Sequence, residues 1–245
     1  GTITASDVSA GGIDIATLAA NASRQGQTTM FDATAALKNG TDLATRGALS
    51  PVEDGYTINL ATLDLTQGQL AAKLNQPANI TIKGASVSLD GVAMDVGGGR
   101  VEAKGEIADT LNLDVAIRAL PLAVANAVKP DLALGGVLDG TAKVAGSRAQ
   151  PAVTFDIKGR ELAAAALKQA GLSRLSIDAR GVSSSEKLDV DAAITSPEGL
   201  NAKVKGAVPL KGGAMDLAIQ LAEFPLATLN TVIPGQNLAG AVTAN

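Results

Sequence analysis

The chain has 245 residues, of which 46% are hydrophobic, 18% are charged and only 2% are aromatic, with a net charge of −4. This balance excludes a disordered chain and predicts an ordered fold whose apolar volume is aliphatic. Without His or Cys, there is no His general base, no thiolate nucleophile and no His- or Cys-bound metal, so we expect neither an enzyme nor a cofactor. A pI near 4.9, with scattered Lys and Arg, argues against nucleic acid as a partner.

Apolar and polar residues alternate with a period of two along most of the chain, which is typical of strands with one buried face. The clearest segment is 111–118, Leu-Asn-Leu-Asp-Val-Ala-Ile-Arg. The other alternating sets are Tyr56, Ile58 and Leu60; Val153, Phe155 and Ile157; Leu188, Val190, Ala192 and Ile194; Leu200, Ala202 and Val204; and Met215, Leu217, Ile219 and Leu221. Turn signals at 54–55, 90–91, 97–99 and 197–199 separate such segments, so the pattern predicts an all-β fold built as an antiparallel meander.

Short helical turns are predicted at three places along the meander. Residues 121–129 begin with a Pro that suits a first helical position, and Pro130 is expected to close this turn. Residues 225–233 follow the same pattern before Pro234. The Ala-rich segment 160–170 favours helix by propensity and is followed by Gly171 at the C-cap position, although a strand could override it.

An internal repeat of about 104 residues relates residues 100–141 to residues 202–245. Eight of the 16 positions from Pro121 to Gly136 are identical to those between Pro225 and Gly240. We therefore expect residues 1–245 to be one continuous β array and a fragment of a longer protein. A basic residue followed by Gly recurs near strand ends, as in Arg46-Gly47 and Lys158-Gly159, and predicts a β-bulge or a strand end.

The chemistry-bearing motifs are sparse. Asp189 and Asp191 fall on the polar side of a predicted strand, which indicates a solvated face rather than a carboxylate pair for catalysis or a metal site. No nucleophile elbow, phosphate loop or complete dinucleotide fingerprint occurs.

The continuous aliphatic face has two interpretations. It is either the sealed core of a sandwich or the interior of an elongated trough that is left open for acyl chains. A repeated unit extends in one dimension, which favours the trough. The predicted groove-lining residues are the inward members of the clearest strands: Leu113, Val115, Ile117, Val153, Phe155, Ile157, Val190, Ile194, Val204, Leu217 and Ile219.

Three segments resemble the TamB family of AsmA-like proteins. They are Leu-Asn-Gln-Pro-Ala-Asn-Ile at 74–80, Val-Gly-Gly-Gly-Arg-Val-Glu-Ala-Lys-Gly at 96–105, and the stretch from Leu-Pro-Leu at 120–122 to Gly-Gly-Val-Leu-Asp-Gly at 135–140. The resemblance runs over about the last 180 residues and is weaker before Ser50. The Ala-rich style, with Ser-Arg-Ala-Gln-Pro at 147–151, is similar to alphaproteobacterial members.

The resemblance implies a taco-shaped β-sheet in the periplasm of a Gram-negative cell, anchored in the inner membrane by an N-terminal helix absent from these residues. It implies the outer-membrane barrel TamA, of the Omp85 superfamily, as a partner. It also implies phospholipid acyl chains or nascent outer-membrane protein segments, such as those of autotransporters, as cargo. No catalytic residues carry over from the family.

A surface adhesin or autotransporter passenger with a closed aliphatic core is the alternative. Such repeats also lack Cys and are rich in Gly, Ala, Thr and Asn. A β-helix would show short strands with a period of about 20 residues, whereas this sequence has long alternating strands and Pro-bounded turns.

Overall fold

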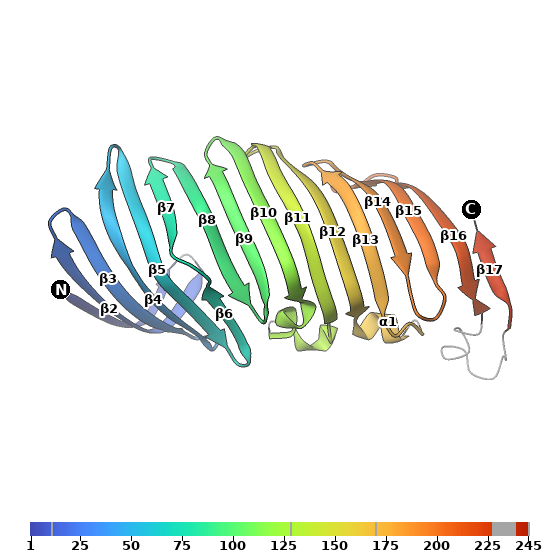
Figure 1. The fold of residues 1–245 in the computed structure, drawn as a ribbon, viewed down its shortest axis with the longest axis horizontal. Coiled ribbons are helices and arrows are strands. Elements are labelled where there is room, and N and C mark those ends of the chain that lie inside the picture. The colour runs from blue at the N-terminus through green and yellow to red at the C-terminus, as the bar shows by residue number, and fades with distance from the viewer. Residues whose placement is uncertain (11, 128, 170, 227–238, 245) are drawn as a thin grey trace. The chain divides into compact units, whose positions relative to one another are not determined.

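The computed structural model describes residues 1–10, 12–127, 129–169, 171–226 and 239–244. These residues are mostly strands, joined by tight turns and three short helical elements (Figure 1). The predicted all-β antiparallel fold is confirmed. None of the described helices has the length and apolar content that a membrane span requires.

The strands fall in two compact units, residues 1–115 and residues 116–245. The N-terminal unit holds β1 (Thr2–Ala10), β2 (Ile13–Gln25), β3 (Thr28–Leu37), β4 (Thr41–Val52), β5 (Gly55–Gln67), β6 (Leu70–Leu74), β7 (Ala78–Lys83), β8 (Ser86–Val96) and β9 (Gly99–Ile107). The C-terminal unit holds β11 (Gly135–Ser147), β12 (Pro151–Ala163), β13 (Leu175–Ser183), β14 (Lys187–Thr195), β15 (Asn201–Pro209), β16 (Asp216–Pro225) and β17 (Ala241–Ala244). Strand β10 (Thr110–Pro121) contains the boundary between the units.

Each unit is an antiparallel meander in which a strand pairs with its successor. In the N-terminal unit this order is interrupted once, because β6 and β7 both pair with β5 on one side and with β8 on the other. Pro77 lies between them and has no backbone N–H to give to a ladder, so one long strand position is divided into two. In the C-terminal unit β11 to β17 follow one another without interruption.

Each unit is a single layer of sheet. Within a unit, the strands make their principal contacts with hydrogen-bonded neighbours, and no second sheet packs on either face among the described residues. The buried apolar side chains there are five alanines, and no large side chain is fully buried. The sealed sandwich is therefore not the architecture of either unit.

The first predicted helical turn is present and is held by one side chain. A 3-10 helix, η1 (Leu122–Ala127), follows Pro121 directly. Asn126 donates from Nδ2 to the Leu134 carbonyl and accepts from the Leu134 N–H at Oδ1, both at 2.9 Å. Pro130 was expected to close the turn but instead opens a second 3-10 helix, η2 (Pro130–Leu132), since the fixed φ of Pro suits a helix start. The predicted turn at 225–233 lies almost entirely outside the described residues.

Two other sequence predictions were wrong in detail. Residues 160–163 continue β12, and only α1 (Ala165–Gln169) is helical, because pairing with β11 and β13 outweighs the helix propensity of the Ala run. The expected turn at Asp90-Gly91 lies inside β8, where the register with β9 shifts between Leu89 and Val92. Gly91 has φ of 67° and so provides a bulge rather than a reversal of the chain.

Candidate functional site

One face of the C-terminal sheet is apolar from β11 to β16. Residues directly opposite each other in an antiparallel pair point to the same side, so the face can be followed from strand to strand. Phe155 pairs with Gly181, and Gly181 pairs with Val190 on the next strand. We call this side the apolar face, and its described members are Leu138, Gly140, Ala142, Val144, Val153, Phe155, Ile157, Gly159, Leu162, Leu175, Ile177, Ala179, Gly181, Ser183, Leu188, Val190, Ala192, Ile194, Ala202, Val204, Gly206, Val208, Leu217, Ile219 and Leu221.

Eight of the predicted groove-lining residues share this face: Val153, Phe155, Ile157, Val190, Ile194, Val204, Leu217 and Ile219. The other three, Leu113, Val115 and Ile117, occupy alternate positions of β10 and are half-buried. Ile219 is the most exposed of the set, at 55%. That these residues line a groove stays a prediction, but the pairing gives most of them a common surface.

Small residues concentrate in the two middle rows of the apolar face. The rows are Gly140, Ile157, Ala179, Ala192, Val204 and Ile219, and Ala142, Phe155, Gly181, Val190, Gly206 and Leu217. On β11 and β13 both middle positions are Gly or Ala, whereas Leu138 and Val144 or Ile177 flank them. We call these rows the small-residue strip. Gly and Ala rise least above the backbone, so the surface is lowest at these six small residues. The large side chains of the same rows, such as Ile157, Val190 and Leu217, rise between them.

The N-terminal unit has a corresponding strip. Its middle rows are Ile3, Ala20, Ala33, Thr45 and Leu63, and Ala22, Phe31, Gly47, Leu60 and Ala78. A row of Leu49, Ile58, Ile80 and Leu89 runs along one side, and a row of Ala5, Leu18, Ala35, Leu43, Leu65 and Ala72 runs along the other. In both units, half of the residues in the two middle rows are Gly or Ala.

A Phe lies across from a Gly in each strip. Phe31 pairs with Gly47 on β4, and Phe155 pairs with Gly181 on β13. A Cβ added to Gly47 would lie 2.6 Å from Cζ of Phe31, and one added to Gly181 would lie 2.8 Å from Cζ of Phe155. Each ring tip therefore occupies the space of the missing side chain and leans over the neighbouring strand. Sequence reasoning missed these Phe–Gly pairs, although both glycines belong to basic-Gly dipeptides, Arg46-Gly47 and Arg180-Gly181.

The opposite face carries exposed ion pairs. Arg46 donates from Nε to Asp32 at 2.6 Å, and Arg180 donates from Nη2 to Asp191 at 3.3 Å. At β8, hydrogen bonds from Arg100 and then Asn75 lower the pKa of Asp95 below its usual value. Pairs that are this exposed add little stability, so their main effect is to favour the correct strand register.

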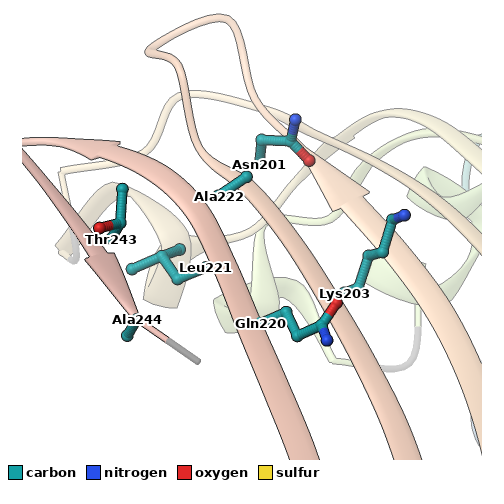
Figure 2. Close-up of a pocket in the computed structure, with 7 residues that line it drawn as sticks. All are labelled: Asn201, Lys203, Gln220, Leu221, Ala222, Thr243 and Ala244. Atoms are coloured by element: carbon teal, nitrogen blue, oxygen red, sulfur yellow. The ribbon is translucent and has the colours of Figure 1, made fainter.

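A cavity of about 570 Å³ lies at β15, β16 and β17 (Figure 2). It is lined by Asn201, Lys203, Gln220, Leu221, Ala222, Thr243 and Ala244. Figure 2 shows the Lys203 ammonium group turned away from Leu221 and Thr243. The charged and polar lining groups do not converge on one point, so the apolar face is the stronger candidate site.

Residues 24–205 match the sequence model of a family described as TamB, N-terminal domain, which is well over half of the chain. The chain belongs to the TamB family. No curated protein and no solved structure was found to match it. The TamB match begins earlier than the expected resemblance, before Ser50, and it ends in β15.

The TamB match contains both Phe–Gly pairs and most of the apolar face, whereas Leu217 and Ile219 on β16 lie beyond it. The TamB family is associated with transport and assembly rather than with catalysis. The candidate site is an aliphatic surface, whose chemistry suits the burial of apolar groups.

Proposed function

We propose that this TamB-family chain is the periplasmic part of a bridge that carries phospholipid toward the outer membrane, with the acyl chains lying on the apolar face. The observation that carries the proposal is that each unit is a single sheet layer with an aliphatic face and no large side chain fully buried. Burial of acyl chains on such a face is favourable because it removes apolar surface from water on both sides.

The chemistry of the face favours an acyl chain over a polypeptide segment. The strand backbones of each sheet are already paired with their neighbours, and Ser183 is the single hydroxyl among the face members that the structure describes in the C-terminal unit. A peptide laid on this surface would leave its N–H and C=O groups unpaired, at a cost that an acyl chain does not incur.

The proposal places the chain in the periplasm, held at the inner membrane by a segment outside these residues and working with TamA at the outer membrane. Its support is the family membership together with the aliphatic face. Assembly of outer-membrane proteins would then depend on the bridge through the lipid supply and the integrity of the outer membrane.

Photo-crosslinking on the two sides of one strand tests the proposal. Val190 lies on the apolar face, while its neighbour Asp191 lies on the opposite face. A photoreactive residue at position 190 is expected to capture phospholipid in cells, and the same residue at 191 is the matched control. Capture of phospholipid at 190 alone supports the proposal. Equal capture at both positions, or capture of polypeptide alone at 190, contradicts it.

A further inference from the structure

The two Phe–Gly pairs occupy equivalent places in the strips of the two units. In the N-terminal unit the row reads Ala22, Phe31, Gly47 across β2, β3 and β4. In the C-terminal unit it reads Ala142, Phe155, Gly181 across β11, β12 and β13. Each ring therefore has an Ala on one side and a Gly on the other, and it is the bulkiest side chain in its row.

The position of the rings determines how far they rise from the sheet. Because each ring tip fills the site of a missing Cβ, the ring leans across the Gly and does not stand upright on the strand. Both Phe residues are half-buried, so part of each ring remains accessible. A chain that lies along this row of the strip passes over the ring, which makes the row shallower at that point.

We propose that Phe31 and Phe155 are specificity-determining residues that limit how thick a chain the strip can hold. This inference rests on the proposed function. A straight acyl chain can keep contact with the strip as it crosses the ring, whereas a methyl-branched chain is lifted away from the neighbouring Ala and Gly and loses contact. The same restriction occurs once in each unit, so a chain that lies along this row in either unit meets one ring.

A purely structural role for the rings predicts something different. Aromatic rings that cover a glycine on the neighbouring strand stabilise sheets, so truncation of either Phe would lower stability whatever the cargo. Only a specificity role predicts that truncation changes the relative affinity for two chains of different thickness.

Competition between two phospholipids with the same headgroup separates these roles. The probes are phosphatidylcholine with palmitoyl and oleoyl chains and phosphatidylcholine with methyl-branched phytanoyl chains, and the bound ratio is measured by native mass spectrometry of the 245-residue chain. We expect Phe31→Ala and Phe155→Ala each to raise the ratio of branched to straight lipid by about threefold, less than a fitted pocket would give for one methyl group.

Leu188→Ala is the matched control, because it shortens a large side chain on the same face at the edge of the strip. The ratio of branched to straight lipid bound by Leu188→Ala should equal that of the unmodified chain. If Phe155→Ala does not fold, Phe155→Leu decides, since Leu keeps apolar volume but cannot reach over Gly181 as the ring does.

The outcomes are distinguishable. A raised ratio in the Phe variants alone supports the inference. Equal ratios in folded Phe and Leu188 variants that still bind lipid overturn it and leave the proposed function standing. If the unmodified chain binds neither lipid, both the proposed function and this inference fall.

Discussion

Strands β3 and β4 of the N-terminal unit and strands β12 and β13 of the C-terminal unit carry the same arrangement on both faces. On the apolar face Phe31 and Phe155 lean over glycines, and on the other face the next residue of each strand, Asp32 or Asp156, is opposite an Arg. The connections differ, because three residues join β3 to β4 whereas eleven residues that include α1 join β12 to β13. The Phe–Gly pair therefore does not depend on the turn that connects its strands.

The two regions differ on the face opposite the apolar face, where the ion pairs lie. Arg46 bonds to Asp32 directly opposite, whereas Arg180 is opposite Asp156 but bonds to Asp191 on the following strand. The position equivalent to Asp191 on β5 is Thr62, which offers no charge. The partner of the Arg is thus interchangeable, while the packing of Phe on Gly is the same in both units.

The largest expected effect comes from a side chain placed at either paired glycine. A Cβ at Gly47 or Gly181 would collide with its Phe ring and with the backbone oxygen of Asn59 or Asp189. Gly47→Ala and Gly181→Ala should each lower the free energy of unfolding by about 1 to 3 kcal/mol, the usual range for overpacking. Denaturant unfolding of both variants measures this.

Gly135→Ala is the control for these variants, because its Cβ would lie at an ordinary 3.4 Å from the Ala163 side chain. Its stability should be close to that of the unmodified chain. A Gly181→Ala chain that unfolds at the same denaturant concentration as the control would show that the two regions are not held by this packing.

A second prediction concerns two connections that come earlier in each unit, β1 to β2 and β10 to β11. β1 ends at Ala10 and β2 begins at Ile13, whereas β10 is joined to β11 through η1 and η2. Asn126→Ala leaves the Leu134 N–H and carbonyl without this partner and should cost about 1 to 2 kcal/mol. Asn126→Asp keeps the acceptor and loses the donor, so its melting temperature should lie between those of the unmodified chain and Asn126→Ala. An Asn126→Ala chain as stable as the unmodified one would contradict the stabilising role of the Asn126–Leu134 hydrogen bonds.

A smaller, pH-dependent effect tests how the longer connection is anchored. Hydrogen bonds from the Ser173 side chain and from its N–H, the latter at 2.9 Å, lower the pKa of Glu198 to about 2. A carboxylate whose pKa is lowered in the folded chain stabilises the fold at any pH above its unfolded-state pKa of 4.5. This stabilisation is lost as the pH falls toward 2. Glu198→Gln should melt below the unmodified chain at pH 7, and the difference should close between about pH 4.5 and 2. A difference in melting temperature that stays constant from pH 7 to pH 2 would contradict the role of the Glu198–Ser173 hydrogen bonds.

The smallest expected effect concerns the ion pairs of Arg180 on the face opposite the apolar face. Asp191→Thr gives the C-terminal unit the arrangement of the N-terminal one, so Arg180 should turn to Asp156. Because the pair is exposed, the coupling between Asp156 and Arg180 should be below about 1 kcal/mol in a double-mutant cycle. It should appear in the Asp191→Thr background and be weaker when Asp191 is present. Equal coupling in both backgrounds would show that Asp191 does not compete for Arg180.

The sequence predicted the strands well because the alternation of apolar and polar residues indicates which side of a strand is exposed to solvent. It placed Val190 and Ile194 on the face where the structure has them, since Val190 lies between two Asp residues and Ile194 continues the same alternation. It did not predict Ala179 as a member of the same face, although this residue is only 6% exposed. Alanine is common on both faces, so its position becomes informative only when strand pairing gives it a neighbour.

The Phe–Gly pairs lay beyond sequence reasoning for a different reason. The 104-residue repeat aligns Pro-bounded turns, but Phe31 and Phe155 are 124 residues apart and their glycines are 134 apart. Connections of unequal length hide such a relation from an ungapped comparison. Helix propensity misled at residues 160–163 because strand pairing, which depends on distant residues, was the stronger interaction.

The central claim, that the apolar face is an open surface for acyl chains, is tested most directly by a charge on one side of β16. Ile219 is on the apolar face and 55% exposed, and Ala218 is its exposed neighbour on the opposite face. Phospholipid bound to Ile219→Arg and Ala218→Arg is measured by native mass spectrometry, with a thermal melt of each. The account predicts that both variants fold and that only Ile219→Arg loses bound phospholipid. Unfolding of Ile219→Arg, as expected for a charge in a sealed core, or undiminished lipid on a folded Ile219→Arg chain, would contradict it.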